Sequence, residues 1–105
     1  LEEILLAAKS SGTALELNAS PERLDLKDTH AYLAKDFGIP LVLNTDSHNV
    51  DGFYNRRYGI AVARRAWCEP QHVLNTLPLS KFIDYISAPK SDRNDIFLAN
   101  LPGGW

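Results

Sequence analysis

The stretch PLVLNTDSHNVDG, Pro40 to Gly52, decides the fold. It begins with an apolar run, and this run ends at two side chains that are able to bind metal. The run IPLVLNT has no polar alternation, which is typical of a strand covered on both faces in a parallel sheet. Asp46 and His48 follow where this strand ends. Functional residues of α/β proteins gather at the carboxyl ends of parallel strands, so this loop is the first candidate site.

Helical and extended patterns alternate on both sides of this strand. Upstream, apolar spacing predicts helices at residues 2–10 and 27–38, and the segment TALELN predicts a strand at 13–18. Downstream, residues 52–67 and 78–87 have helical spacing. This order predicts an α/β fold with a mostly parallel sheet or barrel. Two strands cannot form a stable parallel sheet alone, so we expect further strands to come from upstream sequence or another chain.

Three of the predicted helices have an apolar face that we expect to be buried. The three faces are His30, Leu33, Ala34 and Phe37; Tyr58, Val62, Ala63 and Ala66 beside Gly59; and Leu79, Phe82, Ile83 and Ile86. Gly59 has no side chain, so it permits a close approach of its helix to a neighbour.

Composition limits the class of protein. The 105 residues are 45% apolar with a net charge of -2, which suits the core of one domain. No apolar run is long enough for a membrane span, and no signal peptide is recognisable, so we expect a cytoplasmic protein without membrane contact. A single cysteine, Cys68, excludes an internal disulfide and is expected to be half-buried. The first residues already have a helical pattern at Leu1, so we expect the chain to be part of a longer polypeptide.

Asp46 and His48 have the chemistry of half a metal site. Residues i and i+2 of an extended chain point to the same side, so both can face one interior. A carboxylate can bridge two cations, and an imidazole nitrogen binds zinc, iron or manganese. A catalytic zinc site usually has about three protein ligands, so two are too few. The alternative is that Asp46 caps the next helix and His48 is an exposed loop residue. The D-x-H spacing alone favours this alternative, because the motif is short and common.

Four blocks in a fixed order carry a family resemblance: ALELNASPERLDL, LVLNTDSHNVDG, RRYGIAVARRAW and HVLNTLPL. They resemble the C-terminal part of a PHP (polymerase and histidinol phosphatase) domain, in the form fused to bacterial and archaeal family X DNA polymerases. We therefore predict that residues 1–86 are the C-terminal portion of a PHP metallophosphoesterase domain and that 87–105 are a polar linker and tail. The resemblance implies the last βα units of a distorted (β/α)7 barrel, incomplete in this chain.

The resemblance also implies an activity and its residues. It implies up to three zinc or manganese ions, phosphoester hydrolysis, and 3'-5' exonuclease or DNA-end processing in DNA repair. Asp46 and His48 match the last metal-ligand motif, so they are the expected metal-binding and catalytic residues. Glu16 and Asn18 match the block that ends the preceding strand and are candidates to support the ligands. The other histidines and the glutamate of the family motif are absent, so we expect the chain alone to be inactive.

Basic and aromatic side chains follow the D-x-H loop. Within ten residues that contain no acid lie Arg56, Arg57, Arg64 and Arg65. They form either a phosphate-binding edge for DNA or a solvated face paired with the acidic first half of the chain. Trp67 is either a base-stacking residue or part of the core.

The two other histidines are not expected to bind metal. His30 lies on the apolar side of its predicted helix, so we expect it to be packed. His72 follows Pro70 in a turn, so we expect it at the surface.

The expected partners are DNA, the upstream half of the PHP domain and a polymerase module. Two alternatives remain open. One is a stand-alone PHP phosphatase acting on a small ester of the histidinol phosphate type. The other is a non-catalytic module that packs against a polymerase or self-associates through the segment IFLANL, residues 96–101, and an open sheet edge.

Overall fold

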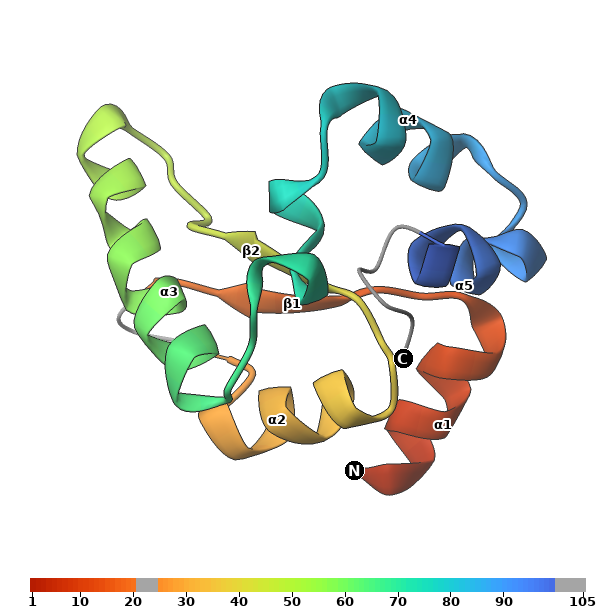
Figure 1. Ribbon diagram of the computed structural model, residues 1–105. Coiled ribbons are helices and arrows are strands. Elements are labelled where there is room, and N and C mark those ends of the chain that lie inside the picture. Colours follow the sequence, from red (N-terminus) through yellow and green to blue (C-terminus); the bar gives the residue numbers. More distant parts are fainter. Residues whose placement is uncertain (21–24, 100–105) are drawn as a thin grey trace.

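The computed structural model describes residues 1–20 and 25–99, in which helices surround a two-stranded parallel sheet (Figure 1). The sheet pairs β1 (Leu15–Asn18) with β2 (Leu41–Asn44). The helices are α1 (Glu2–Ser11), α2 (Asp28–Asp36), α3 (Arg56–Arg65), α4 (Leu79–Ser87) and α5 (Lys90–Ala99), with short 3-10 helices η1 (Val50–Asn55), η2 (Pro70–His72) and η3 (Leu74–Thr76). The parallel pairing and the order of elements agree with the predicted α/β class. In this described part, no helix has the length and apolar character needed to cross a membrane.

The two faces of the sheet are covered by different helices. Leu15 lies opposite Leu41 in the parallel register, and these leucines share a face with Leu17. That face packs against α1, α2 and α3 in the larger core, whose buried members are Leu5, Ala8, Leu17, Ala31, Ala34, Ile39, Leu41, Val62, Ala63 and Ala66. Val42 points to the other face and packs in a smaller core formed by η3, α4 and α5. Burial on both faces explains why the β2 sequence is continuously apolar.

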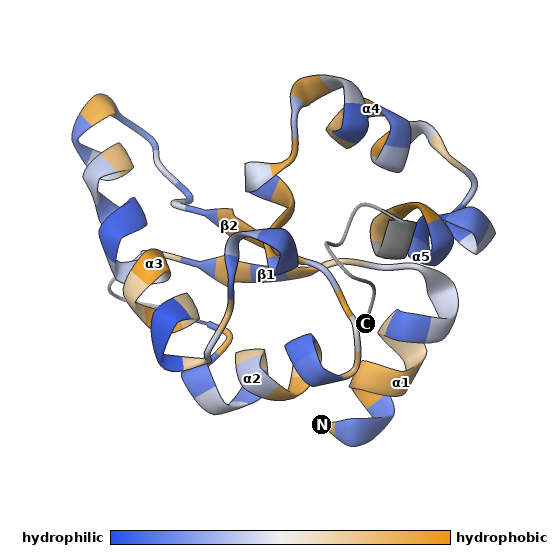
Figure 2. Ribbon diagram, viewed as in Figure 1, coloured by the Kyte–Doolittle hydropathy of each residue, from blue (hydrophilic) through white to orange (hydrophobic). Residues whose placement is uncertain are grey.

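Helix α5 replaces most of the predicted linker. Figure 2 shows that its first residues are hydrophilic. Phe97, further along the helix, is only 2% exposed in the smaller core. The Asn94 side chain also donates to the backbone carbonyl of Lys9 at the end of α1. Residues 90–99 therefore form a packed helix in the segment predicted as a polar linker and tail, and residues 100–105 lie outside the described ones. Phe97 is taken up within the chain, which removes it from the proposed self-association segment.

Two of the three predicted helix faces needed correction. In α2 the fully buried residues are Ala31 and Ala34, whereas Leu33 is exposed, because the small alanines let the helix lie close to the sheet. In α4 the buried residue is Tyr85, and Leu79 is 74% exposed. Tyr85 and Phe82 face the smaller core. The rest of the predicted apolar stripe, Leu79, Ile83 and Ile86, is exposed.

The outer edge of β2 is closed by a side chain. The amide of Asn75 accepts a hydrogen bond from the Leu43 N–H at 2.8 Å and donates to the Leu43 carbonyl at 2.9 Å. It thus satisfies both backbone groups that a further strand would use. Val73 adds a parallel bridge to Leu41 on the same edge. An open edge was the prediction, but η3 and its flanking residues close it at these positions.

The predicted close approach of α3 to the sheet at Gly59 is confirmed. A Cβ atom added to Gly59 would lie 2.9 Å from the Ala19 Cβ and 2.9 Å from the Leu43 Cγ. Val62, Ala63 and Ala66 are buried on the same face. The helix begins at Arg56, later than predicted, because η1 occupies residues 50–55.

We expect Gly59→Ala to lower the free energy of unfolding. Alanine favours a helix over glycine by roughly 1 kcal/mol, but overpacking a close contact costs about 1–3 kcal/mol, and the Ala19 methyl group cannot rotate away. The net loss should be about 1 kcal/mol. Urea unfolding followed by circular dichroism measures it, with Arg57→Ala on the exposed side of α3 as the control. An unchanged or higher stability of Gly59→Ala would show that the contact is not tight.

Candidate functional site

The carboxyl ends of the two strands carry a hydrogen-bonded polar cluster. Asn18 lies opposite Asn44 in the register, and Glu16 shares their face of the sheet. One Glu16 carboxylate oxygen accepts from Asn44 Nδ2 at 3.0 Å, and the other accepts from Asn18 Nδ2 at 3.4 Å. The Asn18 Oδ1 accepts from the Ser20 N–H at 2.9 Å. The cluster fixes a carboxylate and two amides at the edge where the loops begin.

Asn44 was missed as a member of this cluster, although the sequence contains a signal for it. Both strands end with the same pattern, LELN at 15–18 and LVLN at 41–44. Paired in parallel register, such a repeat places the two asparagines opposite each other. Glu16 and Asn18 were predicted to support metal ligands, which stays a prediction. In the structure the Glu16 carboxylate accepts hydrogen bonds from Asn18 and Asn44.

Asp46 follows β2 by two residues and has a left-handed backbone, with φ of 55°. Aspartate adopts this conformation more readily than most residues. The chain therefore turns at Asp46 rather than staying extended. Asp46 and His48 were predicted to point to the same side as residues i and i+2 of an extended chain. The turn at Asp46 removes the basis for this prediction. Both side chains are exposed in the loop between β2 and η1.

The alternative role of Asp46 as a helix cap is wrong. Asn49 is the N-cap of η1, and its Oδ1 accepts from the Gly52 N–H at 3.0 Å. The Ser47 hydroxyl donates to the Asn49 carbonyl and tightens the same turn. Within residues 1–20 and 25–99, no hydrogen bond or ion pair engages the side chain of Asp46 or His48. Their oxygen and nitrogen atoms are therefore free to bind a ligand from solvent.

The donor set suits a metal ion in type but not in number. A carboxylate and an imidazole match zinc or manganese. Among the described residues, no group of three or more histidine, cysteine, aspartate or glutamate side chains comes together. The described residues therefore do not by themselves form a complete metal site.

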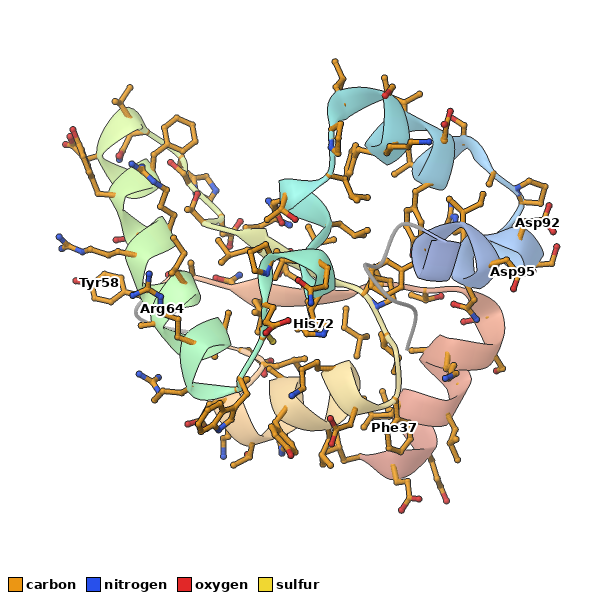
Figure 3. All side chains as sticks on the ribbon, viewed as in Figure 1. Phe37, Tyr58, Arg64, His72, Asp92 and Asp95 are labelled. Carbon is orange, nitrogen blue, oxygen red and sulfur yellow. The ribbon has the colours of Figure 1, made fainter. Side chains whose placement is uncertain are left out.

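The four arginines predicted to bind phosphate all lie on α3 and are all exposed. Arg65 pairs with Asp28 of α2 through an Nε–Oδ2 distance of 3.3 Å, as the alternative of pairing with the acidic half proposed. The Arg57 guanidinium donates to the Tyr58 hydroxyl at 3.1 Å, and Arg56 donates to the Phe53 carbonyl at 3.1 Å. Arg64 has no such partner in the described part of the chain. Figure 3 shows Arg64 and Tyr58 together on α3, far from the acidic Asp92 and Asp95 of α5. 

His72 is buried rather than at the surface, which corrects the prediction. Its Nδ1 accepts from the Glu69 N–H at 2.7 Å, so this nitrogen carries no proton. The chain folds back after Pro70 and pairs Val73 with Leu41, which brings His72 toward the middle of the molecule (Figure 3). Burial lowers the pKa of His72, and the nearby Lys35 ammonium lowers it further, while the Glu69 carboxylate opposes the shift. His72 is thus a structural residue outside the candidate site.

Trp67, Cys68 and His30 complete the residues singled out by sequence. Trp67 is exposed, so its alternative as a core residue is wrong. Cys68 is half-buried as predicted, and burial raises the pKa of its thiol. His30 is half-buried on α2.

Comparison with known proteins places this geometry in context. No protein-family model matches the sequence. Over 79 residues, the chain is 40% identical to the Bacillus subtilis (strain 168) protein DNA polymerase/3'-5' exonuclease PolX. The chain is related to PolX. The matched stretch is 75% of this chain but only 14% of PolX, so the chain spans a small part of that relative's length.

The similarity to PolX includes the candidate site. A stretch of 79 residues within 105 cannot avoid the middle of the chain, so it covers the loop with Asp46 and His48. The relationship to PolX agrees with the part of the predicted resemblance that concerns family X DNA polymerases. The PHP domain and its metal ions stay predictions.

We expect the pKa of His72 to make folding stability depend on pH. The folded-state pKa lies below the ordinary value of 6.5, so the unfolded chain takes up this proton more readily. The contribution of neutral His72 to the free energy of unfolding should be fully present above pH 6.5. It should be lost as the pH falls below 6.5 toward the folded-state pKa. Urea unfolding at pH 7.5, 6.5 and 5.5 measures this fall. In His72→Asn, whose Oδ1 can replace Nδ1 as acceptor, the fall should be smaller, and equal slopes for both proteins would contradict the assignment.

Proposed function

We propose that this chain contributes the last βα units of a PHP-type, metal-dependent phosphoesterase domain in a protein of the PolX type. Its activity would be 3'-5' exonuclease or DNA-end processing. The observation that carries the proposal is the similarity to PolX across a loop at the carboxyl end of a parallel strand. In that loop, the side chains of Asp46 and His48 have no hydrogen bond or ion pair to any other described residue.

The polar end of the sheet supports this role. Asp46 and His48 would supply two ligands to a metal ion, and residues outside this chain would supply the others. The bound ion would neutralise negative charge on a phosphate group. The Glu16 carboxylate, held by Asn44 and Asn18, lies at the same edge and adds negative potential that favours cations there.

The exposed face of α3 supports a nucleic acid substrate. Arg64 has no internal partner in the described part of the chain, and the guanidinium of Arg57 is held against Tyr58, with 5.0 Å between the Arg57 Cζ and the ring centroid. Guanidinium groups bind phosphate oxygens without reading the base sequence. Among the alternatives, the PolX similarity favours DNA over a small phosphate ester, because that relative is a DNA polymerase and 3'-5' exonuclease.

An exchange of segments tests the proposal. The stretch of B. subtilis PolX that aligns with this chain is replaced by the corresponding 79 residues of the chain, and the 3'-5' exonuclease and polymerase rates of the chimera are measured. We expect the chimera to keep exonuclease activity. Asp46→Asn or His48→Gln should lower that rate by about 100-fold or more, because loss of a ligand exceeds the roughly 10–100-fold cost of losing a group that only supports one.

Matched controls separate the site from general damage. Asp51→Asn changes an exposed aspartate in the same loop region, and His30→Gln changes a histidine on α2; both should leave the exonuclease rate near that of the chimera. Thermal unfolding followed by circular dichroism reports that the exchanged domain of each chimera is folded, and polymerase activity reports the state of the polymerase module. A chimera that keeps full exonuclease activity with Asp46→Asn would overturn the assignment of the site. A folded chimera with polymerase activity but no exonuclease activity would overturn the proposed function.

A further inference from the structure

A pocket lies between α2 and the end of α3, apart from the loop that carries Asp46. Its volume is about 540 Å³. The residues that line it are Asp28, Thr29, Tyr32, Leu33, Arg65 and Trp67. It combines two aromatic rings with a guanidinium, a carboxylate and a hydroxyl group, which is the mixture that a small planar polar ligand requires.

The indole of Trp67 is presented to solvent by a fixed backbone. Trp67 has a left-handed φ of 62°, and its N–H donates to the Arg64 carbonyl at 3.0 Å. The next residue, Cys68, donates to the Ala63 carbonyl at 3.0 Å, which closes the end of the helix. The side chain is nevertheless 76% exposed. An exposed indole on a fixed backbone offers a flat apolar surface and has only two side-chain torsions to order on binding.

The α2 side of the pocket provides a second ring and the charged groups. Tyr32 is 41% exposed, and the Lys35 ammonium lies 4.3 Å from the centre of its ring. The Asp28 carboxylate pairs with the Nε of Arg65, and this ion pair orients the guanidinium at the pocket. The remaining N–H groups of Arg65 can still donate to an anion, since the side chain is 58% exposed.

We propose that this pocket binds a nucleobase of single-stranded DNA, with the base stacked on Trp67 and a neighbouring phosphate held by Arg65. Stacking on aromatic rings beside a basic group is the usual way in which proteins bind single strands without sequence preference. Asp28 and Thr29 add polar atoms for the edge of the base. DNA as the partner rests on the proposed function, but the pocket is independent of Asp46 and His48.

Fluorescence of Trp67 tests this directly. The chain has two tryptophans, so Trp105→Phe leaves Trp67 as the single reporter. This variant is titrated with a single-stranded oligothymidylate in the presence of a chelator, so that no metal-dependent step contributes. We expect quenching of Trp67 fluorescence on binding. In parallel, fluorescence anisotropy of a labelled oligothymidylate should show about fivefold weaker binding or more for Trp67→Ala, and also for Tyr32→Ala.

The controls and outcomes are distinct from those of the exonuclease test. Leu79→Ala removes an apolar side chain of similar exposure on α4, and it should not change binding. Circular dichroism confirms that each variant is folded. Binding that leaves Trp67 fluorescence unchanged, or equal affinity of Trp67→Ala and the parent chain, would overturn the pocket. Binding lost in Asp46→Asn but not in Trp67→Ala would also overturn it. If oligothymidylate quenches Trp67 fluorescence but the PolX chimera lacks exonuclease activity, the pocket proposal stands and only the proposed function is rejected.

Discussion

A parallel pairing of only four residues per strand positions the polar cluster and the loop of the candidate site. β1 and β2 place Glu16, Asn18 and Asn44 near the carboxyl end of the sheet, and the Asp46–His48 loop begins at the same end. An isolated two-stranded sheet is marginal in water, so the pairing depends on what covers its faces. Leu17 and Leu41 are fully buried under α1, α2 and α3, and Val42 is packed under the smaller core.

The edges of this sheet show how a short pair is kept from pairing with another chain. The Asn75 side chain satisfies both backbone groups of Leu43, and Val73 bridges Leu41, so β2 presents few free groups outward. On β1, the Asn18 N–H donates to the Asp25 carbonyl across an antiparallel bridge. These devices act on local backbone groups. They leave the polar carboxyl end of the sheet open to solvent, where the candidate site lies.

Local patterns predicted the elements well because they depend on neighbouring residues. Gly12 ends α1 in a left-handed conformation, and the spacing around Gly59 predicted the buried face of α3. The failures were of another kind. The burial of His72 and the choice of Tyr85 as the buried residue of α4 depend on elements that are distant in sequence. The local sequence pattern contains no such information.

The sequence pointed to the residues of the candidate site but not to their geometry. Asp46 and His48 were predicted from chain position and resemblance, and their metal-binding role stays a prediction. Among the described residues, no hydrogen bond or ion pair engages their side chains. The left-handed turn at Asp46 and the capping by Asn49 arise from side-chain and backbone contacts that no periodicity reveals. The Trp67 pocket was only partly anticipated, because Tyr32 joins it from a helix that is distant in sequence.

The central claim is that cations bind at the polar carboxyl end of the β1–β2 pair. Titrating the isotope-labelled chain with Mn²⁺ and recording the broadening of its amide resonances tests this even when binding is weak. The account predicts broadening centred on residues 44–49 and 16–19 that is lost in Asp46→Asn. Broadening centred on Asp92 and Asp95 of α5, or unchanged in Asp46→Asn, would contradict it.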